Sequence, residues 1–159
     1  MKQLKKIIHI FGIITILISL KSCVRGDYES EIREELSSAF EDLFHFYPPY
    51  SIEEIKVKNS VYYDTVMYWM SFTYNFDVIK KIISKDQELK IAFKNSYEFN
   101  QISEFIKNNT HNPKWLKLPN ENTNQIYYKK DFKEHSVLSV YYIWSDTKSG
   151  KTYLYIHSY

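Results

Sequence analysis

The sequence predicts an α+β fold: one domain with an antiparallel sheet of about four to six strands and two or three helices packed on one face of it. Helical spacing of apolar residues dominates the first two thirds of the chain, whereas three strand-like segments follow one another at its end. Helices followed by consecutive strands are typical of this class. With 159 residues, of which 44% are hydrophobic, the chain can bury one core and has little room for a second domain.

The first predicted element is an amphipathic helix that begins near residue 30. Its apolar positions recur with a period of 3.6 residues and are Ile32, Leu36, Ala39, Phe40 and Leu43. Asp27 or Ser30 can cap its start, and Pro48-Pro49 lies beyond its end. The outer face is acidic, and it gives residues 24–46 a net charge of −5.

The middle of the chain alternates between strand-like and helix-like segments. Strands are expected at residues 55–58, 65–74 and 89–93, of which the second is rich in aromatic and β-branched residues. Asn75 can cap a helix that turns Val78, Ile79, Ile82 and Ile83 inward. Ser96 can cap a third helix over residues 97–107.

The end of the chain predicts a polar loop followed by three strands. Within the loop at 108–125, prolines flank an apolar stretch at 113–119, which favours an extended plug over a helix. The strands are expected at residues 125–129, 137–144 and 151–157. The last two form a hairpin in which Gly150 can take a positive φ. The stretch from Pro113 to Tyr153 is similar to the back half of small uncharacterised bacterial proteins, a likeness that implies no activity.

The amino terminus has the pattern of an export signal. Lysines at positions 2, 5 and 6 precede a mostly apolar run at residues 7–20, which is shorter than the roughly 20 residues needed to cross a bilayer. Leu20, Ser22 and Cys23 follow this run, and Cys23 is the only cysteine of the chain. These residues resemble the lipobox of bacterial lipoproteins, although Lys21 stands where that family has a small neutral residue.

The resemblance implies that Cys23 carries the lipid and that the chain is cleaved before it. Residues 1–22 are then the signal peptide, 23–29 the acylated cysteine with a tether, and 30–159 the globular domain. Two or more acyl chains anchor a protein stably, whereas one chain does so reversibly. An uncleaved signal anchor and an ordinary secreted protein are the alternatives. Without residues 1–22 the net charge changes from +2 to −2.

Several function classes find no support in the sequence. A nucleic-acid partner is not expected, because no dense basic stripe is present. Isolated glycines exclude a phosphate-binding loop, so we expect no nucleotide cofactor. The histidines after the signal, at positions 45, 111, 135 and 157, have no metal-binding spacing, and we expect no metal.

A hydrolase site has one candidate cluster, before the strand at 137–144. Asp131, Glu134, His135 and Ser136 lie close in sequence, but such clusters are common in polar connections. No GxSxG motif is present to expose a serine. We therefore assign no catalytic residue.

Aromatic residues in the predicted strands are the remaining signal. An exposed row of them can bind a protein or a sugar ring, and the candidate binding surface consists of Trp69, Trp115, Tyr142, Trp144, Tyr153 and Tyr155. The alternative interpretation, which we favour, is cross-strand packing in a chain whose composition is rich in tyrosine.

The sequence as a whole predicts a lipoprotein of the bacterial cell envelope, facing the periplasm or the cell surface. Membrane lipid, through Cys23, is one expected partner, and another protein is the second. The expected role is non-catalytic binding, for example by an inhibitor or immunity-like module whose acidic helix meets a basic target. A small envelope hydrolase with an unidentified active site is the alternative.

Overall fold

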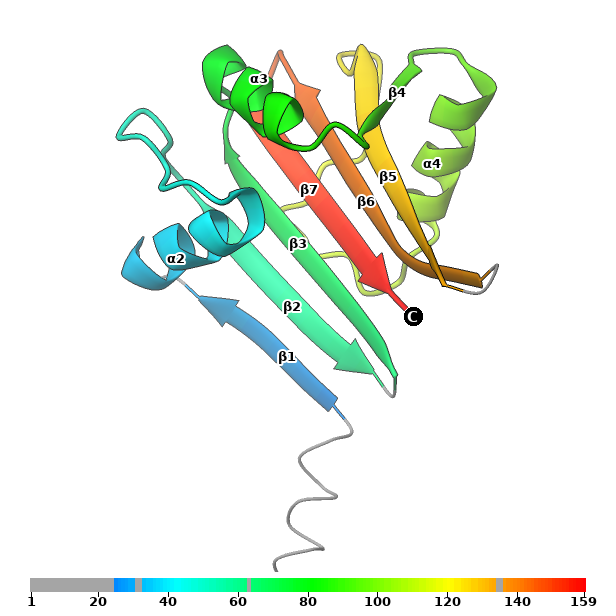
Figure 1. Cartoon of the computed structure of the whole chain (residues 1–159), viewed down its shortest axis with the longest axis horizontal. Helices are drawn as coiled ribbons and strands as arrows, with labels where there is room; N and C mark the ends of the chain where they lie inside the picture. Colours follow the sequence, from blue (N-terminus) through cyan, green and yellow to red (C-terminus); the bar gives the residue numbers. More distant parts are fainter. Residues whose placement is uncertain (1–24, 31–32, 63, 134–135) are drawn as a thin grey trace, which may run out of the picture.

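A computed structural model of the chain describes residues 25–30, 33–62, 64–133 and 136–159. Over these residues the chain forms one antiparallel sheet and three helices (Figure 1). The strands are β1 (Arg25–Ser30), β2 (Lys56–Tyr62), β3 (Thr65–Thr73), β4 (Lys90–Phe93), β5 (Gln125–Lys133), β6 (Ser136–Asp146) and β7 (Lys151–Ser158). The helices are α2 (Arg33–Phe44), α3 (Phe76–Lys85) and α4 (Tyr97–Lys107). The predicted single-domain α+β class is confirmed.

The sheet has the order β1-β2-β3-β7-β6-β5-β4, and every neighbouring pair is antiparallel. Strands β2 to β7 form on the six segments expected to be strands. The seventh, β1, lies largely in the segment 23–29 that the sequence analysis treats as a tether, and it pairs with β2 from Arg25 opposite Tyr62 to Ser30 opposite Val57. Only one residue, Val24, therefore separates Cys23 from the start of the sheet in the sequence.

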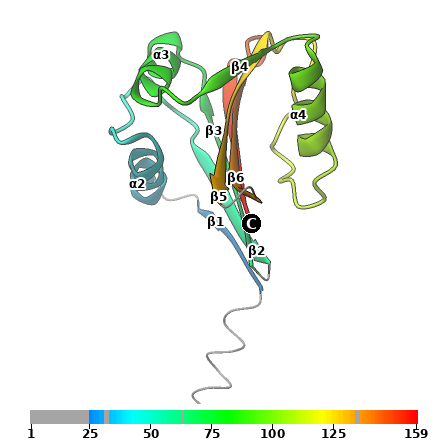
Figure 2. The same cartoon turned by 45° about the vertical axis from the view of Figure 1, so that its right-hand side comes forward.

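The helices cover both faces of the sheet, which corrects the expectation that they pack on one. Helices α2 and α3 lie on one side and α4 on the other (Figure 2). Strand β7 shows the physical reason, because its buried residues alternate between two hydrophobic cores. Leu154 and Ile156 pack with α2 and α3, whereas Tyr153 and Tyr155 pack with α4. A strand that is apolar on both faces needs a cover on each side.

Aromatic contacts hold α2 on its face of the sheet. Phe40 is fully buried, and its ring meets Phe44, Phe46 and Phe72 with centroids 4.6, 5.5 and 5.3 Å apart. Edge-on contacts of this kind add about 0.5–1.5 kcal/mol each to the free energy of burial. The ammonium of Lys81, on α3, lies 4.1 Å from the centroid of Phe46 and so connects α3 to the segment that follows α2.

The loop between α4 and β5 packs against the opposite face, as its apolar residues predict. Leu116 and Leu118 contact the core on the α4 side, and Leu116 donates a backbone hydrogen bond to Pro113 in a turn. The indole nitrogen of Trp144 donates to the carbonyl of Lys117 at 3.1 Å. The indole of Trp69 likewise donates to Asn112 at 3.1 Å. Two core tryptophans therefore fix the loop to the sheet.

Candidate functional site

The aromatic residues expected to form a binding surface belong instead to the core on the α4 side. Five of them are no more than 3% exposed, namely Trp69, Tyr142, Trp144, Tyr153 and Tyr155, and Trp115 is half-buried against the same core. Paired neighbours on adjacent strands stack, with centroids 5.5 Å apart for Trp69 and Tyr155 and 5.6 Å apart for Trp144 and Tyr153. They therefore form no exposed row, and cross-strand packing accounts for them.

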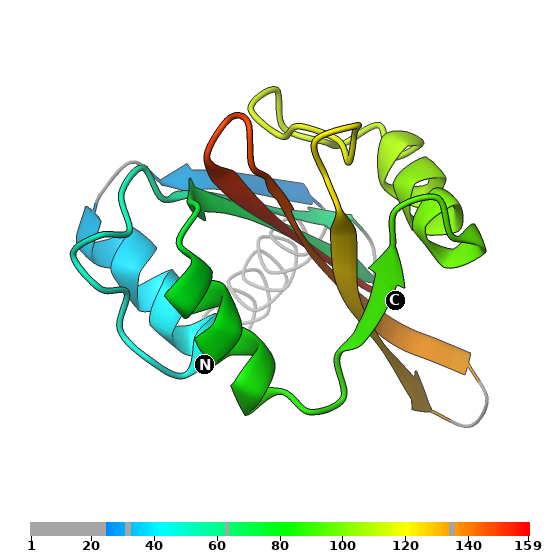
Figure 3. The same cartoon turned by 90° about the horizontal axis from the view of Figure 1, so that it is seen from above.

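A groove lined by residues of α3 and β5 opens on the other face of the sheet. Figure 3 shows where these two elements lie, α3 in green and β5 in gold. Its volume is about 500 Å³, within the range of ligand-binding pockets. Aromatic and aliphatic side chains dominate its walls, with a few neutral polar groups and one lysine. The lining residues are Tyr74, Phe76, Ile79, Lys80, Ile83, Ser84, Asn124, Gln125, Tyr127, Ser145 and Thr147. We call it the α3 groove.

Helix α3 forms one wall of the α3 groove because its sequence is amphipathic and well capped. The side chain of Asn75 accepts hydrogen bonds from the backbone of Asp77 at 3.0 Å and of Val78 at 3.1 Å. Ile79 and Ile83 then face the sheet, and both line the groove. Phe76, in the first turn, is 66% exposed at the groove although its side chain is apolar.

Tyr127 and Gln125 of β5 line the opposite side of the groove. The Gln125 amide donates a hydrogen bond to the Tyr127 hydroxyl. Burial raises the pKa of Tyr127 above its ordinary value, and the neighbouring Tyr74 adds a smaller increase. The phenol therefore stays neutral at physiological pH. This side of the groove therefore offers a ring and a few neutral polar groups to a ligand.

Strand β4 extends the apolar surface beyond the groove to the edge of the sheet. Ile91 pairs with Tyr127 and Phe93 pairs with Gln125. Residues paired across antiparallel strands point to the same face, so Ile91 and Phe93 stand beside the groove. They are 45% and 61% exposed. Together with Phe76 they form an exposed apolar rim.

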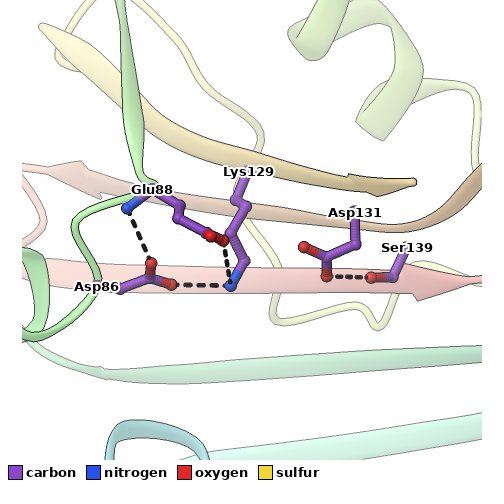
Figure 4. A network of polar contacts seen from close by, with 5 residues as sticks. All are labelled: Asp86, Glu88, Lys129, Asp131 and Ser139. Carbon is purple, nitrogen blue, oxygen red and sulfur yellow. Dashed lines mark hydrogen bonds and ion pairs between the residues drawn. The ribbon is translucent and has the colours of Figure 1, made fainter. Parts of the chain in front are cut away.

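A polar network lies farther along the same face, around Lys129 of β5 (Figure 4). Its ammonium lies 3.0 Å from Asp86 and 3.8 Å from Glu88, and 5.1 Å from the centroid of the Tyr141 ring. Partial burial opposes the charge on Lys129, but the hydrogen bond and charge of Asp86 outweigh it and raise the pKa of the ammonium. The network fixes the connection between α3 and β4 to the sheet.

Asp131 is the one member of the expected hydrolase cluster whose side chain the structure describes. It accepts a hydrogen bond from Ser139 at 2.6 Å, and Ser139 is only 8% exposed. A hydroxyl so enclosed is poorly placed to attack a substrate. The side chains of Glu134, His135 and Ser136 lie outside the described part, as does Cys23.

A second cleft, of about 400 Å³, lies on the α4 side near the end of that helix. It is lined by Tyr62, Thr65, Met67, Phe105, Asn108, Asn109, Thr110, His111, Tyr155 and His157. The Tyr155 hydroxyl lies 2.9 Å from Nδ1 of His157 and accepts a hydrogen bond from Asn109 at 2.5 Å. Burial raises the pKa of Tyr155 and lowers the pKa of His157, so both groups are neutral at pH 7. We call it the α4 cleft.

Comparison of the chain with protein-family models, curated proteins and solved structures finds no match. In the part of the chain that the structure describes, no helix combines the length and the apolar character needed to cross a membrane. Within the same part, no group of three or more histidine, cysteine or carboxylate side chains is arranged to hold a metal ion.

The sequence predicted neither the α3 groove nor the α4 cleft, because each depends on which strands become neighbours in the sheet. The stretch Lys90–Phe93 has the alternation of a strand, but only the sheet order shows that β4 lies at an edge, with Ile91 and Phe93 exposed. The one available signal was the presence of large apolar residues on a short strand that begins with a lysine. Such a strand is typical of a sheet edge.

Proposed function

We propose that the protein is a lipid-anchored binding module of the cell envelope, which takes an apolar segment of a protein partner in the α3 groove without catalysing a reaction. The observation that carries this proposal is the exposed apolar rim of Phe76, Ile91 and Phe93 around a groove of about 500 Å³. Contiguous exposed apolar side chains mark interaction sites on soluble domains.

The composition of the groove favours a protein partner with an aromatic or aliphatic anchor. Interfaces gain most of their affinity from a few such side chains that enter an apolar pocket with a polar surround. The α3 groove offers that arrangement, since Ile79, Ile83 and Tyr127 line it and Lys80 and Thr147 supply polar groups. Because the rim continues onto β4, a bound segment would contact both the groove and the sheet edge.

Charge on the same face supports an inhibitor-like role toward a basic target. Helix α2 lies on the same side of the sheet as α3 (Figure 2), and Glu34, Glu41 and Asp42 on it are exposed. Exposed acidic groups on the same side of the sheet as a binding site can steer a basic partner and raise the rate of association. In this proposal, α2 makes a second contact with the partner, in addition to the contact in the α3 groove.

Anchoring at Cys23 would place the α3 groove away from the bilayer. Strand β1 begins at Arg25, so at most about 7 Å of extended chain separates the start of the sheet from the acylated residue. The groove adjoins β5 and β4 at the opposite edge of the sheet. Six strand spacings of about 4.8 Å separate the two edges by roughly 29 Å. The anchor thus holds one edge at the membrane while the other faces a partner.

A photo-crosslinking experiment in the native bacterium tests the proposal. A benzoylphenylalanine at position 93 lies on the groove rim, and the same residue at position 50 serves as the control because Tyr50 is 93% exposed and outside the groove. We expect one adduct of defined mass from position 93 and none from position 50. We also expect that adding Phe76→Glu reduces the adduct at least tenfold, since it puts a charge into the apolar rim.

Equal adducts at both positions, or an adduct that Phe76→Glu leaves unchanged, would contradict the proposal. The substitutions should leave the fold intact, because exposed positions change the free energy of unfolding by about 0.5 kcal/mol or less. Urea denaturation of each purified variant checks this. Loss of the adduct with unchanged stability therefore reports on binding.

A further inference from the structure

The α4 cleft has a different chemistry from the α3 groove, and we infer that it binds an uncharged saccharide ring. Its lining includes Phe105 of α4 and the residues that follow this helix. Helix α4 covers the face of the sheet opposite α3 (Figure 2), so this inference does not depend on the groove. Three features of the cleft lead to it: aromatic rings in its lining, neutral polar groups beside them, and the absence of lysine, arginine and carboxylate residues from its lining in the part of the chain that the structure describes.

Aromatic rings are prominent in the lining of the α4 cleft. Tyr62 is 42% exposed, and its ring centroid lies 6.1 Å from that of His111. The ring of His157, which is stacked on Tyr159 with centroids 4.4 Å apart, lies 5.7 Å from the ring of Phe105. The C–H face of a sugar ring is apolar and packs on such rings, whereas its hydroxyls point outward to polar neighbours.

Neutral hydrogen-bonding groups line the same cleft. Asn108 and Thr110 are exposed at the cleft, and Thr65 also lines it. Amide and hydroxyl side chains can both donate and accept hydrogen bonds, as the hydroxyls of a sugar require. The cleft therefore matches a polyhydroxylated ring better than a purely apolar ligand.

Asn109 holds this part of the cleft in place. Its amide nitrogen donates to the Tyr155 hydroxyl at 2.5 Å, and its side-chain oxygen accepts a hydrogen bond from the backbone of His111 at 2.9 Å. These bonds connect the loop after α4 to β7 and orient His111 toward Tyr62. Asn109 is thus a positioning residue, and a preorganised cleft loses less entropy when a ligand binds.

The charge balance excludes an anionic ligand as the best fit. Burial lowers the pKa of His157, which leaves its imidazole neutral at pH 7. The ammonium of Lys58 lies 3.4 Å from the carbonyl oxygen of His111 and 5.6 Å from the Trp69 ring, and it does not line the cleft. No lysine or arginine lines the cleft to pair with a phosphate or carboxylate, whereas a neutral sugar needs no such partner.

Titration of the full chain with oligosaccharides tests this inference. The protein is kept in a zwitterionic detergent, because detergents with sugar headgroups would compete, and the probes are the tetramer of N-acetylglucosamine and cellotetraose. Tryptophan fluorescence provides the readout, since Trp69 stacks on Tyr155 at 5.5 Å and is bonded to the loop after α4. We expect a saturable change with at least one of the two oligosaccharides.

Variants assign the binding to the cleft. Tyr62→Ala should weaken it at least tenfold, and Tyr62→Phe should restore it because the ring is kept. Tyr50→Ala, at a 93% exposed position away from the cleft, and the groove variant Phe93→Asp should leave it unchanged. Near-ultraviolet circular dichroism shows that each variant is folded. An effect of Phe93→Asp would place the sugar in the groove and overturn the inference.

Two other outcomes would also overturn it. The first is no saturation by either oligosaccharide up to tens of millimolar. The second is tighter binding of adenosine or of N-acetyltryptophanamide, with the same dependence on Tyr62, because that would assign the cleft to a flat aromatic ring. Failure of the crosslinking experiment at position 93 would leave the sugar titration unaffected, so the two proposals can fail separately.

Discussion

Tyr68 carries a buried hydroxyl that has no hydrogen-bond partner among the described residues. An unsatisfied buried polar group costs about 1–3 kcal/mol. We predict that Tyr68→Phe increases the free energy of unfolding by about 1 kcal/mol, measured by urea denaturation at pH 7. Tyr155 is the matched control, because its hydroxyl bonds to Asn109 and lies beside His157. Tyr155→Phe should decrease stability by about 1 kcal/mol. A loss of stability in Tyr68→Phe would contradict this account.

The buried tyrosines also predict how stability depends on alkaline pH. Burial raises the pKa of Tyr68 and Tyr155 above 10 and that of Tyr142 to about 12. Above pH 10 the unfolded chain loses these protons while the folded chain keeps them, so the unfolded state binds fewer protons and stability falls as pH rises. We predict a plateau below pH 9 and a decline from pH 10 to 11 in urea denaturation. Tyr142→Phe should make this decline shallower, and an equal decline in that variant would contradict the assignment.

The sequence predicted helix caps and turn conformations better than it predicted which side chains are exposed. The sequence indicated Asn75 and Ser96 as helix caps, and both side chains accept bonds from the first turn. It also indicated a positive φ at Gly150, where φ is 64°. It could not show that Tyr142 and Tyr155 are enclosed, because alternation assigns a strand residue to a face but not to a covered one. The cover, α4, comes from elsewhere in the chain.

The hairpin between β6 and β7 depends on its turn. Asp146 accepts hydrogen bonds from the backbone of Lys148 at 3.0 Å and of Ser149 at 3.1 Å. Burial opposes its charge, but the bonds from Ser149 and Lys148 outweigh this and lower its pKa. Gly150 then reverses the chain with a positive φ and has open space where a Cβ would lie. The turn therefore requires a positive φ at Gly150, whereas space for a side chain is available there.

We predict that Gly150→Ala decreases the free energy of unfolding by about 1 kcal/mol, because an L-residue is strained at this φ. Gly150→Asn should cost less, since asparagine adopts the left-handed conformation more readily. Thermal and urea denaturation measure both variants. An equal loss in the two, or none in Gly150→Ala, would show that backbone strain does not govern the turn.

Helix α3 depends on its cap in a comparable way, and it forms a wall of the α3 groove. Asn75→Ala removes the acceptor for the backbone of Asp77 and Val78. We predict a loss of about 1 kcal/mol in urea denaturation. Asn100→Ala, an exposed position within α4, is the control and should change stability little. A similar change in both variants would mean that the cap contributes nothing specific.

At the level of secondary-structure elements, the sequence predicted the six strands β2 to β7 and the three helices. Each of these segments has a local pattern of apolar residues that is typical of a strand or of a helix. It did not predict β1, whose stretch Arg25–Ser30 carries three charged residues and one glycine and has no strand pattern. Pairing with β2 is what makes this segment a strand. The order of the sheet, in which β7 lies between β3 and β6, also follows from distant contacts that no local pattern encodes.

The whole molecule places three distinct features at different positions on one sheet. Strand β1 forms one edge, the α3 groove adjoins the other edge, and the α4 cleft lies on the opposite face. Because β1 begins two residues after Cys23, the proposed lipid anchor would fix the direction in which the groove faces. The groove and the cleft would then be accessible to a partner and to a glycan at once.

Mass spectrometry of the protein isolated from the cells that produce it tests the proposed lipid anchoring most directly. The account predicts a mature chain that lacks residues 1–22, begins at a diacylglycerol-modified Cys23, and incorporates labelled palmitate. It also predicts that Cys23→Ala abolishes the label and leaves the signal uncleaved. An unmodified Cys23 in a full-length chain of 159 residues, or unchanged membrane attachment and cleavage in Cys23→Ala, would contradict it.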